Sequence, residues 1–273
     1  MNLDNQKINF VIIGKPNSGK STLFNRLLRK EISPAGKAYG LTKELFVQKF
    51  TFNKVDFIIH DTPGLRRKSR ISNKDEELRN KKVVSLLKII DVAVLLIDST
   101  EDMTKQDFKI ADIIMRRKKL LFFVFNKIDL LDNQKEFKKK IKKFLDFRYS
   151  QSNEINKTFI SALSGKNIFD LLNQIIKQNQ LLSCKIKKSH LNTFVKRISK
   201  SDKLPRMKNI SIKPKYIVQI NSEIPRFKIF INTKKKAPNL FIRYFENEFR
   251  KYFSLKGVPI YMKFISSDNP FTD

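Results

Sequence analysis

Short apolar runs alternate with amphipathic segments over the first two thirds of the chain. The runs have strand length and polar or glycine flanks, whereas the amphipathic segments repeat their apolar residues at helical spacing. The predicted elements are a strand at 8–13, a helix at 19–29, strands at 45–52 and 55–60, a helix at 76–90, a strand at 91–97, a helix at 105–117, a strand at 120–125, a helix at 135–147, a strand at 157–160 and a helix at 167–179. This alternation predicts an α/β fold, a mostly parallel sheet with helices on both faces. Ligands are then expected at the carboxyl ends of the strands.

The pattern changes around residues 180–190. Beyond them we predict a helix at 189–199, strands at 215–221 and 226–232, a helix at 238–253 and a last strand at 258–265. This is the composition of a small α+β domain. The predicted organisation is a first domain over 1–180, a linker over 181–188 and a second domain over 189–273.

Positive charge dominates the composition. Lys and Arg number 57 against 26 Asp and Glu, which gives a net charge of +31. Such a field favours a polyanionic partner, with nucleic acid first and an anionic membrane second. Codon bias toward A and T also enriches Lys, so the position of the cations matters more than their number. They are densest from residue 179 onward, where 21 Lys and Arg face 6 Asp and Glu.

Cysteine content and hydropathy indicate the compartment. The one cysteine, Cys184, excludes an internal disulfide and a zinc cluster of cysteines, which favours a reducing environment. The first residues lack the layout of a signal peptide, and the longest apolar runs are far shorter than a membrane span. A soluble cytoplasmic protein without a membrane span is expected.

The loop after the first predicted strand carries a phosphate-binding motif. Its residues match G-x-x-x-x-G-K-[ST] between a strand and a helix: Gly14, Lys15, Pro16, Asn17, Ser18, Gly19, Lys20, Ser21 and then Thr22. Glycines let backbone N–H groups wrap phosphates, and the helix N-terminus adds its positive dipole end. Lys20 is expected to reach the β- and γ-phosphates, and the Ser21 hydroxyl to ligate magnesium.

Two further motifs stand at later strand ends. Asp61-Thr62-Pro63-Gly64 ends the predicted strand at 55–60, where Asp61 is expected to hold magnesium through water and the Gly64 N–H to contact the γ-phosphate. Asn126, Lys127 and Asp129 follow the strand at 120–125, and Ser161, Ala162 and Leu163 follow the strand at 157–160.

These last groups predict the base. The Asp129 carboxylate can accept from both N1–H and the 2-amino group of guanine, a pair that adenine does not offer. Asn126 is expected to hold the loops, Lys127 to pack along the ring, and the Ala162 N–H to meet guanine O6. A site built on such hydrogen bonds rejects analogues that lack them. The predicted nucleotide is GTP. His60, at the end of the strand at 55–60, is expected to be packed rather than catalytic.

The chain resembles the Der (EngA) family of translation-associated GTPases. The resemblance rests on "GKPNSGKSTLFNRLL", "DTPGLRRKSRI", "QDFKIADII", "FNKIDL" and "RYFENEFRKYFSLKGVPIYMKF". It implies a P-loop GTPase domain followed by a small α+β KH-like domain, and a role in assembly of the large ribosomal subunit. Family members resemble a tandem of two G domains before the KH-like domain, whereas this chain has room for one and looks like the second.

The resemblance also implies catalytic roles. Thr42 would complete magnesium coordination, although Lys43 and Glu44 depart from the family pattern around it. Leu65 follows the D-x-x-G motif and cannot orient water by hydrogen bonding, so a potassium ion held by Asn17 is expected to stabilise the developing charge. The residues predicted to be catalytic are therefore Lys20, Thr42, Gly64 and Asn17. We expect a GTPase that is slow alone and potassium-dependent, acting as a monomer.

The expected partners are the large ribosomal subunit and its rRNA, with no DNA. The second domain has basic tracts but no G-x-x-G loop, which favours shape-and-phosphate docking over reading of single-stranded bases. The cations Arg66, Arg67, Lys68 and Arg70, beside the γ-phosphate sensor, would couple nucleotide state to partner binding. Two alternatives stay open: an Era-like factor of the small subunit, and an RNA-binding protein that holds GTP with little turnover.

Overall fold

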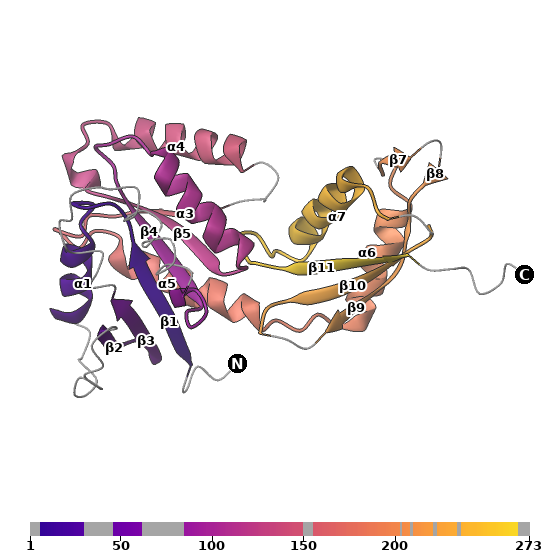
Figure 1. The fold of residues 1–273 in the computed structure, drawn as a ribbon, viewed down its shortest axis with the longest axis horizontal. Helices are drawn as coiled ribbons and strands as arrows, with labels where there is room; N and C mark the ends of the chain where they lie inside the picture. The colour runs from indigo at the N-terminus through magenta and orange to yellow at the C-terminus, as the bar shows by residue number, and fades with distance from the viewer. Residues whose placement is uncertain are drawn as a thin grey trace, which may run out of the picture. The chain divides into compact units, whose positions relative to one another are not determined.

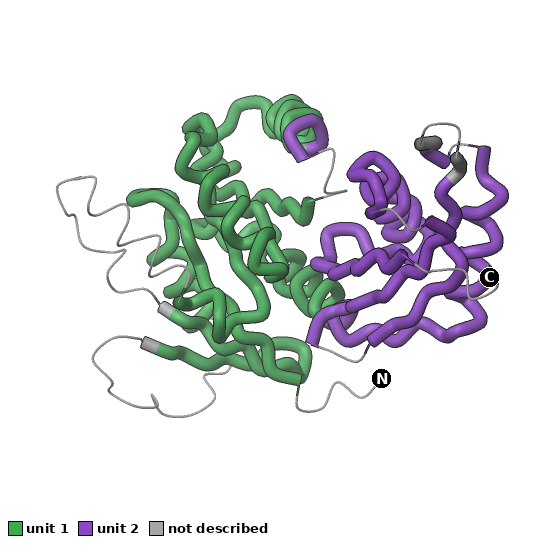
Figure 2. Tube along the Cα trace, turned by 45° about the vertical axis from the view of Figure 1, so that its right-hand side comes forward, with its two compact units in different colours: residues 1–145, 155–179 green, residues 146–154, 180–273 purple. Residues whose placement is uncertain are grey.

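The computed structural model describes residues 6–29, 46–61, 85–149, 155–202, 204–207, 210–220, 223–233 and 236–266. Figure 2 shows that the chain divides into two compact units, residues 1–145 with 155–179 and residues 146–154 with 180–273. We refer to them as the first unit and the second unit. The domain limits inferred from the sequence stay a prediction.

The first unit is built on a six-stranded sheet with the order β2-β3-β1-β4-β5-β6 (Figure 1). All neighbouring strands are parallel except β2 and β3, which form an antiparallel pair. The strands are β1 (Lys7–Ile13), β2 (Phe46–Phe52), β3 (Val55–Asp61), β4 (Val92–Asp98), β5 (Leu120–Asn126) and β6 (Asn156–Phe159). Strands β4 and β5 are buried at every residue, as expected for parallel strands that are covered on both faces.

The helices cover both faces because parallel strands are joined by right-handed crossovers. The helices that the structure describes around this sheet are α1 (Lys20–Arg29), α3 (Lys105–Arg116), α4 (Gln134–Arg148) and α5 (Ile168–Leu182). The chain passes from β1 toward one edge of the sheet but from β4 toward the other, so α1 lies on one face and α3 and α4 on the opposite face (Figure 1). The direction of winding changes between β1 and β4, which is where an open α/β sheet forms its ligand crevice.

The second unit has a three-stranded sheet with the order β11-β10-β9. Its elements are α6 (Lys188–Ser199), β7 (Arg206–Met207), β8 (Ile210–Ser211), β9 (Pro214–Ile220), β10 (Arg226–Ile231), α7 (Asn239–Tyr252) and β11 (Tyr261–Ser266). Both helices pack on one face of the sheet, around a core in which Phe194, Phe227, Phe241, Phe245 and Phe249 are almost fully buried.

A buried cation fixes the loop between α7 and β11. Arg250 is only 6% exposed, and its guanidinium bonds the Glu246 carboxylate at 2.9 Å. The remaining guanidinium nitrogen, Nη1, donates to the carbonyl oxygen of Leu255, at 3.2 Å, and to that of Val258. A buried charge is tolerable only when it is paired in this way. Arg250 thereby sets the path by which the chain enters β11.

The structure confirms the predicted fold class. Each strand and helix predicted from the sequence is present within a few residues of its expected place, apart from the helix at 76–90, of which only residues 85–90 are described. Helix α5 runs on to Leu182 because Leu181 and Leu182 pack against the core of the second unit. The two-residue strands β7 and β8 and the 3-10 turn Ile128–Leu130 were not predicted because segments this short carry no periodicity.

Candidate nucleotide-binding site

The loop between β1 and α1 needs its two glycines for space. A Cβ at position 14 would lie 2.2 Å from the backbone oxygen of Leu96, and one at position 19 would lie 2.1 Å from Nδ2 of Asn126. Gly19 also has a φ of +93°, which favours glycine. Asn17 reaches a φ of 65°, in the left-handed region, where Asn is tolerated better than most residues. The backbone of this loop is therefore packed tightly against the ends of β4 and β5.

Polar groups of the loop converge at the N-terminus of α1. The Lys20 ammonium donates to the carbonyl oxygen of Lys15, which draws this side chain back over the loop. Ser18 is 2% exposed, and its hydroxyl has no hydrogen-bond partner among the described residues. Ser21 and Thr22 are exposed in the first helical turn, which has no acidic residue. The backbone N–H groups of a helix start, together with two exposed hydroxyls, suit an anion with its counter-cation.

Asn126 joins the phosphate loop to the loop after β6. Its side chain is 2% exposed, and Nδ2 donates to the carbonyl oxygen of Ser18 at 2.9 Å. Its Oδ1 accepts from the Ala162 N–H at 2.8 Å. The predicted role of holding the loops together is what these contacts provide. The Ala162 N–H, predicted to meet the base, is engaged with Asn126 in this structure.

Lys127 is held by a carboxylate that sequence reasoning did not single out. Its ammonium pairs with Oδ2 of Asp98, the last residue of β4, while Oδ1 accepts from the N–H and hydroxyl of Thr100 at 3.0 and 2.8 Å. Burial acts to raise the pKa of Asp98, but the bonds from Lys127 and Thr100 outweigh it, so the pKa lies below its ordinary value. Lys127 has a φ of 64°, and Asp129 follows it, exposed, at the carboxyl end of β5.

The loop after β6 is fixed from two sides. Ser161 is fully buried, and its hydroxyl accepts from the Ser164 N–H at 3.1 Å. Arg26 of α1 donates to the carbonyl oxygens of Ala162, at 3.3 Å, and Leu163. Leu163 is 72% exposed. Arg26, like Asp98, was missed because a single residue outside a motif leaves no signal in the sequence.

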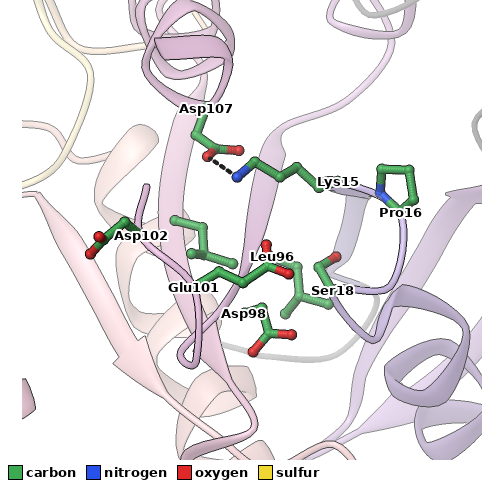
Figure 3. A pocket seen from close by; sticks show the side chains of 9 residues that line it. Lys15, Pro16, Ser18, Leu96, Asp98, Glu101, Asp102 and Asp107 are labelled. Atoms are coloured by element: carbon green, nitrogen blue, oxygen red, sulfur yellow. Dashed lines mark ion pairs between the residues drawn. The ribbon is translucent and has the colours of Figure 1, made fainter. Parts of the chain in front are cut away.

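Lys15 points away from the loop centre. Figure 3 shows its ammonium paired with Asp107 of α3, at 3.3 Å, over a hollow beside the loop. Asp107 is 2% exposed, and its carboxylate also accepts from the N–H and the hydroxyl of Thr104, both at 2.8 Å, in the capping box of α3. These bonds make the burial of the carboxylate tolerable. The hollow is further lined by Asp98, Glu101 and Asp102, so phosphate is disfavoured there. Of Lys15, only the backbone remains on the phosphate side.

His60 is a packing residue. It is 8% exposed, and Nε2 lies 3.1 Å from Oδ1 of Asn9. The other amide atom of Asn9, Nδ2, donates to the Asp91 carboxylate at 3.2 Å. Burial lowers the pKa of His60, and this effect exceeds the opposing influence of Asp91. The neutral ring thus completes a polar contact between β1 and β3.

The structure brings most of the predicted site to one edge of the sheet. Gly14 follows β1, Lys127 and Asp129 follow β5, and Ser161 follows β6. Thr42 and Thr62-Pro63-Gly64 lie outside the described residues, as do Lys43, Glu44, Leu65 and the cations of 66–70. Asp61 ends β3, with only its backbone described. The predicted roles of these residues stay predictions.

Two family models match the chain. Residues 9–127 match the 50S ribosome-binding GTPases, and residues 185–264 match the C-terminal KH-domain-like domain of EngA bacterial GTPase enzymes. GTPase Der of Azorhizobium caulinodans is 30% identical over 269 residues, which are 98% of this chain and 59% of that protein. GTPase Der of Rickettsia prowazekii is 30% identical over 267 residues, or 97% and 60%. The chain thus spans less than two thirds of these relatives.

A solved structure shares the fold. Translation elongation factor SelB from Methanococcus maripaludis, in complex with the GTP analogue GppNHp, has a TM-score of 0.50 and 20% identity. The likeness covers 80% of this chain and 44% of that one. Among the described residues, none of the helices combines the length and hydropathy needed to cross a bilayer.

Proposed function

Because the chain belongs to the Der (EngA) family, of which it carries one G domain and the C-terminal KH-like domain, we propose that it is a GTP-hydrolysing factor in assembly of the large ribosomal subunit. It binds the ribosome and its rRNA when loaded with GTP and leaves after hydrolysis. The observation that carries the proposal is the pair of hydrogen bonds by which Asn126 joins the loops after β1 and β6.

The loop after β1 fits a nucleotide triphosphate. The glycines at 14 and 19 leave no room for a Cβ against neighbouring strands, which holds the loop tightly against β4 and β5. A loop of this kind at a helix start presents backbone N–H groups to phosphate. Lys20 already stands over the loop and would exchange the Lys15 carbonyl for phosphate oxygens. Such positioning and electrostatic stabilisation supply most of the catalysis in phosphoryl transfer.

Guanine selection rests on the loops after β5 and β6. The Asp129 carboxylate is exposed at the end of β5 and free of the ion pair that engages its neighbour Lys127. Asp98 holds the Lys127 ammonium, so the stem of that lysine is fixed where the base would lie. Since the Ala162 N–H also serves Asn126, guanine O6 has to share this donor, and we assign the greater part of the discrimination to Asp129.

Cations complete the proposed chemistry. Magnesium, when bound, neutralises charge on the phosphates, and the Ser21 hydroxyl with Thr42 and Asp61 is the proposed ligand set. Asn17 is exposed in a left-handed conformation, and we propose that its amide oxygen contributes to a potassium site. Potassium would then replace the water-orienting glutamine that Leu65 does not provide.

Sedimentation with separated ribosomal subunits tests the proposal. In potassium buffer, the chain loaded with a non-hydrolysable GTP analogue is expected to sediment with the large subunit, and the GDP-loaded chain to stay in the supernatant. Asp129→Asn, which removes the proposed guanine acceptor, should abolish the difference at limiting nucleotide. Equal retention in both states, or preference for the small subunit, would contradict the proposal.

A further inference from the structure

The sheet of the second unit has one face that neither of its helices covers. Residues 227, 229 and 231 of β10 are buried beneath α6 and α7, so their neighbours in β10 point to the opposite face, because side chains alternate along a strand. The register carries this face across all three strands. The outer face, as we call it, consists of Tyr216, Val218 and Ile220 in β9, Arg226, Lys228 and Phe230 in β10, and Tyr261, Lys263 and Ile265 in β11.

The outer face gathers cations and contains no acidic residue of its own. Arg226, Lys228 and Lys263 are exposed, and none of the nine residues of the face, all of which the structure describes, is acidic. Lys228 and Lys263 are direct neighbours in the register, and Val218 flanks Lys228 on its other side. Like charges directly opposite one another destabilise a sheet. This arrangement is unfavourable for folding alone, and an anionic ligand would relieve it.

Aromatic rings accompany these cations. Tyr216 is 45% exposed and stacks on Phe230 with centroids 4.1 Å apart and ring planes at 16°. Tyr261 is 42% exposed, and the Arg226 guanidinium lies 5.2 Å from its ring centroid. The remaining exposed apolar residue, Val218, is 44% accessible between them. Flat rings beside cations on an open sheet are the features that bind unpaired nucleotides, whose bases stack while their phosphates are neutralised.

We propose that the outer face binds single-stranded RNA. Bases stack on Tyr216 and Tyr261, and phosphates lie against Arg226, Lys228 and Lys263. From Arg226 to Phe230 the strand spans about 13 Å, enough for two or three stacked bases. The proposal rests on the proposed ribosomal function and names the RNA that the second unit takes. It replaces the expectation of docking by shape and phosphate alone with recognition of unpaired segments.

Binding of labelled RNA to the full chain tests the proposal. Fluorescence anisotropy is measured with an unstructured 12-nucleotide RNA and with the same strand in a blunt duplex, the chain being loaded with GDP. The single strand is expected to bind at least tenfold tighter than the duplex. Binding of the duplex with equal or greater affinity would overturn the proposal.

Charge removal gives the second readout. The variant R226Q/K228Q/K263Q should bind the single strand more weakly, and the slope of log affinity against log salt should become shallower by about 2, since three phosphate contacts are lost at roughly 0.7 each. The matched control K188Q/K196Q/R243Q removes the same charge from exposed positions of α6 and α7 and should change affinity at most about twofold. Equal effects of the two variants would show that only net charge matters, and would overturn the proposal.

Stacking gives the third readout. Tyr261→Ala should lower affinity for the single strand about tenfold, whereas Tyr261→Phe, which keeps the ring, should retain it. Thermal unfolding of each variant shows whether the second unit remains folded. Loss of affinity in both Tyr261 variants, or in neither, would contradict base stacking, as would tighter binding of the wild-type chain to anionic lipid vesicles than to RNA.

The two proposals fail separately. A wild-type chain that sediments with the large subunit only under the GTP analogue, but shows no preference for single strands, overturns the outer-face proposal alone. A chain that prefers single strands but sediments equally in both nucleotide states overturns the proposed function and leaves the outer face as an RNA-binding surface.

Discussion

The loops around Asn126 and the outer face of the second unit use polar side chains in opposite ways. The two hydrogen bonds of the Asn126 side chain are buried, and they join segments far apart in the sequence, residue 126 with residues 18 and 162. On the outer face the cations are exposed and lie beside one another, and none of the nine residues that make up the face is acidic. Buried hydrogen bonds are costly to break and therefore enforce geometry, whereas exposed charges contribute salt-dependent attraction with little geometric constraint. In the two proposals made above, the first arrangement contributes to selection of guanine, and the second contributes to affinity for RNA.

The largest effect is expected from Asn126→Ala, which removes the group that joins the two loops. The Ser18 carbonyl and the Ala162 N–H would lose their partner while buried, which should lower the free energy of unfolding by about 2 kcal/mol. Affinity for GTP should fall more than tenfold because both loops contribute to one site. Thermal unfolding and titration with a fluorescent GTP analogue measure these changes.

An exposed amide is the control for that variant. Asn173→Ala removes a side chain whose bond to Asn53 is exposed, and it should change neither quantity appreciably. If Asn126→Ala and Asn173→Ala behaved alike, the loops would not depend on the buried amide.

An effect of intermediate size is expected from one of two matched arginine substitutions, one in the nucleotide site and one on the outer face. Arg26→Lys should weaken GTP binding several-fold, because an ammonium does not reproduce the fork that reaches two carbonyl oxygens of the loop after β6. Arg226→Lys preserves the charge on the outer face and should leave GTP affinity unchanged. Nucleotide titration of both variants provides the measurement, and equal losses would contradict the division of roles.

The smallest effect concerns the pH dependence of Asp98. Its pKa is lower in the folded chain than its ordinary value of 3.8, so the unfolded chain binds the proton more readily. The stabilisation is therefore fully present above that ordinary value and is lost as pH falls through the lower pKa of the folded state. Thermal unfolding of the wild type and Asp98→Asn should differ most near pH 7 and should begin to converge only as the pH falls below 3.8.

Asp132→Asn, at an exposed position, controls for the loss of one negative charge. A difference between the wild type and Asp98→Asn that widened on acidification would contradict the sign given to the Asp98 contribution.

The fold was largely predictable because its signals are contiguous. Strands such as β4 and β5 are almost unbroken apolar runs, and two glycines at a fixed spacing identify the phosphate loop. The contact that Asn126 makes with two loops was also foreseeable, because the carboxyl ends of parallel strands meet at one edge.

Other features depend on tertiary contacts between single residues. Arg26 and Asp98 act through partners that lie between 29 and 137 residues away in the sequence. Asp107 acts through Lys15. No local pattern marks them. The strand register likewise separates the two aromatic residues of β10, with Phe227 inside and Phe230 on the outer face.

Arg250 has a consequence beyond the stability of the second unit. By holding the carbonyl oxygens of Leu255 and Val258, it determines where β11 begins, and hence that Tyr261 and Lys263 stand beside Arg226 and Lys228. A one-residue slip of an edge strand would turn each of its side chains to the other side. The buried Arg250 thus fixes which side chains of β11 lie on the outer face. A substitution at Arg250 would change the composition of a surface to which Arg250 itself does not belong.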